Sequence, residues 1–190
     1  MTVGLVITDA PQEPVWRVGY QPEPLAWSGW EHATDGRFHG RWDDCIATLQ
    51  RHLSMATALW KDERAASMRY IAKAYIQKGD LFQARGWFFR ATAEAPHLRE
   101  PWMDLATLCY QQEHWDGVLY FTGVALAITV RPDTYICEAE AWGPLPHDLR
   151  CQAYFRTGRI DPALEEAQKA LALSPADSRL ASNVEILSQM

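Results

Sequence analysis

Residues 65–98 read AASMRYIAKAYIQKGDLFQARGWFFRATAEAPHL, and this stretch decides the fold. Apolar residues recur at spacings of three and four on both sides of Lys78-Gly79-Asp80, a pattern typical of two amphipathic helices joined by a tight turn. Small residues stand where the two helices must touch, at Ala72, Ala84 and Ala91. Large residues stand where a groove must be filled, at Met68, Ile71, Tyr75 and Phe88. The stretch therefore predicts an antiparallel helical hairpin.

Versions of this hairpin recur further along the chain. The second copy, at 99–130, keeps one period, because Tyr75 and Cys109 are 34 residues apart, as are Ala91 and Ala125. The third copy, at 144–177, is displaced by about eleven additional residues, which fall within 131–143. The motif of a large residue, then A-x3-F, then a closing proline at this period resembles the tetratricopeptide (TPR) repeat.

The TPR resemblance implies an all-α fold, a right-handed TPR-like solenoid of about three helix pairs with flanking helices. Stacked pairs bury the apolar faces that one pair leaves open. The expected domain covers 42–190 and consists of a leading helix at 42–61, repeats at 65–98, 99–130 and 144–177, an insertion at 131–143 with one short helical turn, and a capping helix at 178–190.

Residues 1–41 differ from the rest, because Pro11, Pro14, Pro22 and Pro24 exclude a long helix there. Strand-like residues at 3–7 and 15–18 predict a short irregular arm that includes a β-hairpin. Its aromatic residues are expected to fasten the arm to the helices: Trp16, Tyr20, Trp27 and Trp30.

Composition and charge exclude several classes of function. A net charge of -6 disfavours a nucleic-acid or anionic-membrane binder, since both need clustered Lys and Arg. No apolar run approaches the roughly 20 residues that span a bilayer, and the first residues lack the basic and apolar regions of a signal peptide. The four cysteines form no C-x-x-C pair and are expected to be free, mostly buried thiols. These features predict a cytoplasmic protein.

Catalytic motifs are missing from the sequence. No pair of histidines has H-E-x-x-H spacing, and the glycine motifs that bind phosphates or dinucleotides are absent, as is the G-x-S-x-G elbow. The densest set of candidate metal ligands matches no metal-site spacing: His32, His39, Asp43, Asp44 and Cys45. We therefore expect no enzymatic activity, no metal and no cofactor.

The candidate site is the concave face, which the first helix of each pair lines in a TPR array. The residues expected to form it are Arg69, Lys73, Gln77, Met103, Thr107, Tyr110, Gln152 and Arg156. They offer cations for a carboxylate and aromatic surface for an apolar anchor, although a merely solvated inner face explains the same pattern. TPR domains that grip a chaperone's C-terminal carboxylate use a Lys/Asn/Arg set that Arg69 and Lys73 match in part. Asp104 and Leu149 depart from that set.

The region 31–190 also resembles the C-terminal repeats of bacterial and phage family 2 glycosyltransferases. The similarity is carried by EAWGPLPHDL at 140–149, AYFRTGR at 153–159 and the linker-like segment from Thr34 to Leu49. That family has a preceding nucleotide-sugar-binding domain with an Asp-x-Asp motif, and this chain has neither. The resemblance therefore implies no catalytic residues here.

The sequence leaves three functions open. The leading hypothesis is a non-catalytic TPR module that binds a peptide or partner protein through its concave face. The first alternative is an accessory domain that recognises the acceptor in a glycosyltransferase system. The second is a structural solenoid that self-assembles into a homo-oligomer through its N-terminal arm.

Overall fold

The computed structural model describes residues 40–190, and the predicted arm, with its β-hairpin and aromatic residues, lies outside the described residues. Residues 40–190 form eight α-helices and one 3-10 turn, and they contain no strand. The helices are α2 (Trp42–Ser54), α3 (Lys61–Gln77), α4 (Leu81–Glu94), α5 (Arg99–Gln111), α6 (Trp115–Ala127), α7 (Leu145–Arg156), α8 (Ile160–Leu173) and α9 (Ser178–Ser188), with η1 (Ala139–Trp142) between α6 and α7.

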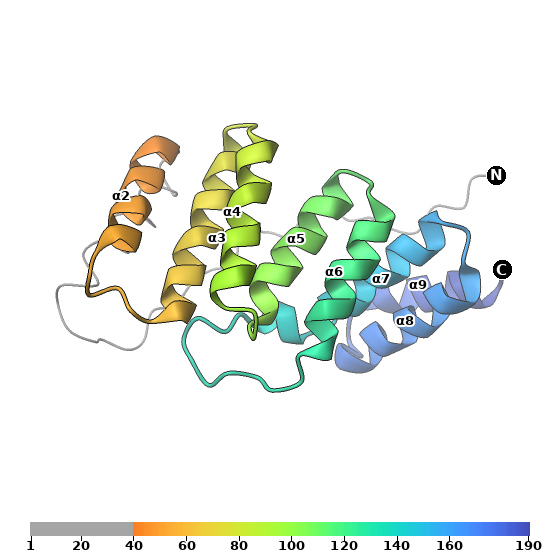
Figure 1. Ribbon diagram of the computed structural model, residues 1–190. Coiled ribbons are helices and arrows are strands. Elements are labelled where there is room, and N and C mark those ends of the chain that lie inside the picture. Colours follow the sequence, from red (N-terminus) through yellow and green to blue (C-terminus); the bar gives the residue numbers. More distant parts are fainter. Residues whose placement is uncertain (1–39) are drawn as a thin grey trace.

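The helices stack in chain order as antiparallel hairpins. The pairs α3/α4, α5/α6 and α7/α8 follow one another, with α2 packed on α3 at one end and α9 packed on α8 at the other (Figure 1). The first helices α3, α5 and α7 form one side of the array, which we call the inner face. The predicted all-α helical solenoid is therefore confirmed.

All three hairpins turn with the same backbone hydrogen bond. The amide N–H of Asp80 donates to the carbonyl of Tyr75, that of His114 to Cys109, and that of Arg159 to Tyr154, each at 2.9 Å. The turn requires a residue with positive φ, which is Gly79 (φ 78°) in the first hairpin and Gly158 (φ 75°) in the third. The repeat spacing read from the sequence thus corresponds to one repeated turn geometry.

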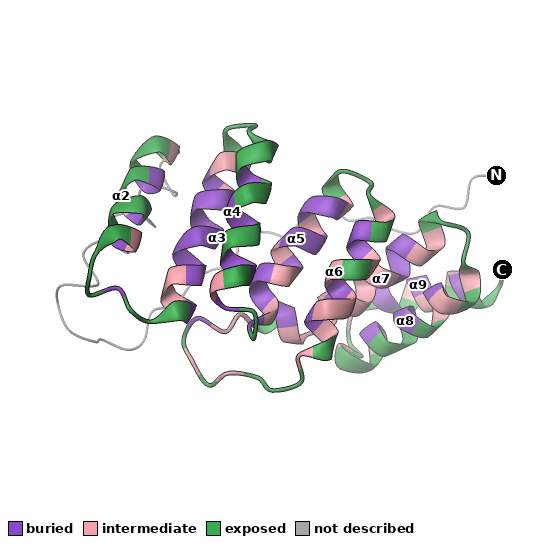
Figure 2. Ribbon diagram, viewed as in Figure 1, coloured by how far each residue is buried: buried purple, intermediate pink, exposed green. Residues whose placement is uncertain are grey.

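Small residues lie where the helices meet. The alanines of the contact positions are all 0% exposed: Ala72, Ala84, Ala91, Ala125, Ala163 and Ala170. Larger side chains such as Phe88 and Ile71 fill the space beside them, and Figure 2 shows the buried residues on the sides of the helices that face one another. Close helix packing in all three hairpins therefore depends on these short side chains.

The leading helix is shorter than the 42–61 that the apolar pattern predicts, because α2 ends at Ser54. Arg64 on α3 binds backbone carbonyls at and after this end: its Nη1 donates to the Leu53 carbonyl at 3.0 Å and to the Ala58 carbonyl at 3.3 Å. Its Nε donates to the Glu94 carboxylate at 2.8 Å. Leu59, which follows the end of the helix, is 80% exposed. The next helix is correspondingly longer than predicted, because α3 begins at Lys61 rather than at residue 65.

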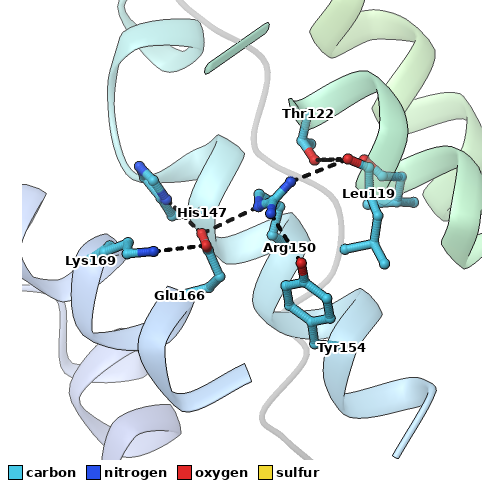
Figure 3. A network of polar contacts seen from close by, with 8 residues as sticks. Leu119, Thr122, His147, Arg150, Tyr154, Glu166 and Lys169 are labelled. Atoms are coloured by element: carbon cyan, nitrogen blue, oxygen red, sulfur yellow. Dashed lines mark hydrogen bonds and ion pairs between the residues drawn. The ribbon is translucent and has the colours of Figure 1, made fainter. Parts of the chain in front are cut away.

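The third hairpin is held by charges instead of apolar residues at two positions. His147 and Arg150 stand where the second repeat has Trp102 and Leu105. Both contact the carboxylate of Glu166 on α8, and Arg150 also donates to the carbonyl of Leu119 on α6 at 3.2 Å (Figure 3). These contacts tie α7 to the helices on either side of it.

Candidate interaction surface

The structure divides the eight predicted inner-face residues into two groups. Lys73, Gln77, Thr107, Tyr110 and Arg156 keep exposed surface, whereas Arg69, Met103 and Gln152 are buried. The exposed residues lie toward the C-terminal ends of α3, α5 and α7, and we call them the open part of the inner face. The buried Arg69, together with Glu100 and Asp104 on α5, forms what we call the front part. Residues of the connection between α6 and α7 cover it.

Arg69 is the centre of the front part. Its Nη2 lies 2.8 Å from Glu138 Oε2, its Nε bonds Asp104, and its side chain is only 3% exposed. Burial disfavours the charged guanidinium, but the two carboxylates outweigh that penalty and raise the pKa of Arg69 well above its ordinary value. Lys73 lies 3.4 Å from the same Asp104 carboxylate, so the ion cluster extends toward the open part.

The connection between α6 and α7 covers the front part. It leaves the end of α6, runs back beneath α5 toward α3, and returns through η1 to α7 (Figure 1). Tyr135 packs edge-on against Trp60, with ring centroids 5.6 Å apart, and Ile136 is buried in the same apolar cluster as the core of α3. Burial raises the pKa of Tyr135 to about 12.

Two residues at the start of α5 hold the other end of the connection. Glu100 Oε1 accepts from the Glu138 backbone N–H at 3.0 Å and from Trp142 Nε1 at 3.3 Å. The guanidinium of Arg99 lies 3.9 Å from the centre of the Trp142 ring and donates to the Ile128 carbonyl at 2.8 Å. The connection is therefore bound to the inner face by ionic, backbone, apolar and cation–π contacts together.

The rear of the inner face repeats these positions with reversed charge. At the repeat distance that relates the first hairpin to the third, Arg69 corresponds to Asp148 and Glu100 to Arg179. Arg179 on α9 grips Asp148 on α7 with both amine groups, at 3.2 and 2.8 Å. The hydrogen bond with Asp148 raises the pKa of Arg179 despite partial burial. The inner face is thus cross-linked by ion pairs at both ends.

An aromatic group lies in the open part, beside this rear ion pair. The rings of Tyr110 and Trp115 meet edge-on with centroids 5.7 Å apart, and the Arg156 guanidinium lies 5.9 Å from the centre of the Trp115 ring. Burial and the nearby Asp148 raise the pKa of Tyr110, so its hydroxyl is a neutral hydrogen-bond donor at physiological pH. Tyr110, Trp115 and Arg156 therefore place a phenol, an indole ring and a cation side by side.

The sequence pattern missed the residues that cover the front part. Glu138, Trp142 and Tyr135 lie in a segment without periodicity, and Glu138 is 69 residues from Arg69 along the chain. The one sequence signal for them is the insertion at 131–143 itself, because it interrupts an otherwise regular repeat.

Over residues 40–190, no group of three His, Cys, Asp or Glu side chains is placed to hold a metal ion. None of the helices described there combines the length and apolar character needed to cross a bilayer.

Comparison with solved structures agrees on the architecture. MamA superposes with a TM-score of 0.64 at 13% identity, over 86% of this chain and 81% of that one. PilF of Pseudomonas aeruginosa gives 0.59 at 12% identity over 87% and 67%, and the Cut9–Hcn1 hetero-tetramer gives 0.62 at 13% over 86% and 30%. These neighbours are TPR-repeat proteins. The fold is a TPR-like solenoid. At such identities the similarity concerns the fold alone.

No protein-family model and no curated protein matches the chain. The resemblance to the C-terminal repeats of glycosyltransferases gains no support from the similar structures, and it stays a prediction from sequence.

Proposed function

We propose that the chain is a non-catalytic scaffold that binds a peptide or partner protein through the open part of its inner face. The observation that carries the proposal is the exposed group of unlike side chains on three successive first helices: Lys73, Gln77, Thr107, Tyr110 and Arg156. Such a group combines charge, hydrogen bonding and aromatic area, which are the components of binding hot spots.

The geometry of the open part supports this function. The side chain of Lys73 is 32% exposed although it lies near Asp104, so its ammonium group is available to a partner carboxylate. Tyr110 and Arg156 both contact Trp115, which restricts their motion and lowers the entropy lost when a partner binds. These side chains come from α3, α5 and α7, the three helices that form the inner face.

A capture experiment with matched variants tests the proposal. The bait proteins are the unaltered chain, Lys73→Glu and Tyr110→Ala, with Lys61→Glu on the same helix and Tyr120→Ala on α6 as controls. Lys61 and Tyr120 are exposed but lie off the open part. We expect one partner, identified by mass spectrometry, to be retained by the unaltered chain and the controls and lost by at least ten-fold from both variants. Equal recovery on all five baits would remove this face from the function.

Self-assembly through the N-terminal arm is the second candidate. It is favoured by exposed aromatic residues on the second helices, where Phe82 is 85% and Tyr120 63% exposed, because such side chains offer docking area to another copy. Sedimentation of the full chain and of a variant lacking residues 1–40 tests it, since only the full chain should then form oligomers. An accessory role beside a glycosyltransferase rests on the sequence resemblance alone.

A further inference from the structure

The connection between α6 and α7 occupies the front part in the way a bound peptide would. Its residues 135–138, Tyr-Ile-Cys-Glu, supply one aromatic ring, one aliphatic side chain and one carboxylate to the inner face. Trp60 receives Tyr135, the apolar cluster of α3 receives Ile136, and Arg69 receives Glu138. No helix or strand is present at 128–138, and Tyr135 and Ile136 lie in a tight turn that the Cys137 N–H closes by donating to the Thr134 carbonyl at 3.1 Å.

The main chain of this segment is also recognised. Glu100 is 1% exposed, and its carboxylate accepts the backbone N–H of Glu138 at 3.0 Å. A contact with a backbone N–H fixes the position of a segment whatever its side chains are, whereas pockets for alternate side chains select its sequence. The front part therefore has both the positioning and the selecting elements of a peptide site.

We propose that the front part is a recognition site for a partner's acidic segment that forms the same turn, with the order aromatic, aliphatic, any residue, glutamate. Residues 135–138 hold this site closed until such a segment displaces them. The proposal deepens the function given above and rests on it, because the partner bound at the open part would carry the segment.

The charge of the occupant follows from Arg69. With Glu138 withdrawn, this buried guanidinium keeps Asp104 but loses the carboxylate on its Nη2. A buried cation that loses one of its partners is costly, and only another carboxylate restores the same charge-assisted bond. Lys73 adds a second positive charge on the path from the open part, so an acidic segment is favoured on approach as well.

Competition with the connection sets the apparent affinity. Because residues 135–138 are tethered at both ends, a segment added in solution competes with a ligand at high effective concentration. The apparent affinity for the added segment equals its intrinsic affinity multiplied by the fraction of molecules in which the site is free. Weakening the contact made by Glu138 should therefore strengthen the binding of an added peptide.

The first experiment measures binding of a fluorescein-labelled peptide that carries residues 132–143 with Cys137→Ser. Fluorescence anisotropy is recorded with the unaltered chain, with Glu138→Gln, and with Glu140→Gln, which changes an exposed carboxylate of the same connection. We expect Glu138→Gln to bind the peptide at least ten-fold more tightly than the other two proteins. A peptide with glutamine in place of its own Glu138 should lose at least ten-fold. Equal affinities for both peptides would overturn the carboxylate requirement.

Hydrogen exchange in the unaltered chain guards against a variant that simply unfolds. At saturating peptide, the Glu138 amide should exchange faster, since the in-chain segment leaves Glu100, while the amides of α7 and α8 stay unchanged. Peptide binding without faster amide exchange at 131–143 would overturn the proposal, and so would the absence of peptide binding to both the unaltered chain and Glu138→Gln. If the peptide fails while Lys73→Glu and Tyr110→Ala still lose the captured partner, this inference falls and the proposed function stands. If Lys73→Glu and Tyr110→Ala instead retain the partner while the peptide still binds, the open part loses its proposed function and the recognition site at the front part stands.

Discussion

The carboxylate of Glu166 on α8 lies 2.7 Å from the ring of His147 on α7, measured from Oε2 to Nδ1. Arg150 approaches the same carboxylate at 3.4 Å and Lys169 at 3.0 Å, while the Glu166 side chain is only 8% exposed (Figure 3). Burial alone would raise the pKa of Glu166, but the hydrogen bonds from His147 and Lys169 and the charge of Arg150 lower it to about 2. This carboxylate is therefore ionised in the folded chain well below the pH at which it protonates in the unfolded one.

The lowered pKa predicts an acid-sensitive third hairpin. A pKa of about 2 in the folded state against 4.5 in the unfolded state gives Glu166 a stabilising contribution that is complete above about pH 5 and is lost as the pH falls toward 2. The size of that contribution is roughly 3 kcal/mol. Glu166→Gln should lower the free energy of unfolding by roughly this amount at pH 7, and by much less near pH 2.5.

Denaturant unfolding followed by circular dichroism measures both values. The matched control is Glu165→Gln, which changes the exposed neighbouring carboxylate on the same helix and should alter stability little. A destabilisation by Glu166→Gln that is the same at pH 7 and at pH 2.5 would contradict the assigned role of the charge.

The three hairpin turns offer a paired test of backbone strain. Glu113 has φ 55° at the place where the first and third turns have glycine. A residue with a Cβ is disfavoured in this left-handed region by about 1–2 kcal/mol, part of which is offset by the greater freedom of glycine in the unfolded chain. Glu113→Gly should therefore raise the free energy of unfolding by up to about 1 kcal/mol. Gly79→Ala, where no atom lies within 4 Å of the added Cβ, should lower it by a similar amount through conformation alone. Opposite signs in equilibrium unfolding are the expected result, and equal signs would refute it.

How far the sequence leads differs between the periodic and the aperiodic parts of the chain. The recurrence of Tyr75 at Cys109 was enough to predict the hairpins, because a hairpin is a local structure and its turn repeats with the period. The pairing of Arg69 with Glu138 was not predictable in this way, since it joins residues 69 positions apart and one of them lies outside any repeat. Arg150 stands at a position that is apolar in the second repeat, and its contacts with Glu166 and with the Leu119 carbonyl explain it.

The candidate site shows the same division. Repeat position alone selects the inner face, so Lys73 and Tyr110 were found there by counting along the helices. Whether such a position is open depends on what else covers it, and here the aperiodic connection covers Arg69 while leaving Tyr110 accessible. The end of α2 was missed for a related reason, because the guanidinium that caps it comes from Arg64 in the following helix.

The four cysteines, none of which forms a disulfide, should react with thiol reagents in a fixed order. Cys45, Cys109 and Cys151 are buried, whereas Cys137 in the connection is partly exposed. Burial raises the pKa of Cys151 to about 12, so this thiol is both shielded and protonated. In a 5,5′-dithiobis(2-nitrobenzoic acid) assay at pH 8, we expect the native chain to release about one equivalent of chromophore first, assigned to Cys137 by mass spectrometry. The remaining thiols should react only after denaturant is added, and early modification of Cys151 would contradict the packing of α7 against α8.

Close contact of α3 with α4 predicts that a large residue at Ala84 disrupts the first hairpin. Ala84 is fully buried on the side of α4 that meets α3, whereas Ala93 on the same helix is exposed. Ala84→Arg would force a long charged side chain between two helices at a position that is 0% exposed. The cost should exceed the roughly 1–3 kcal/mol of ordinary overpacking, because the buried charge adds to it. Ala93→Arg introduces the same residue into the same helix without this conflict and should change stability by less than about 0.5 kcal/mol. Thermal unfolding of the two variants separates the contributions of helix propensity and helix contact: an unchanged midpoint for Ala84→Arg would mean that α3 and α4 do not pack through this position.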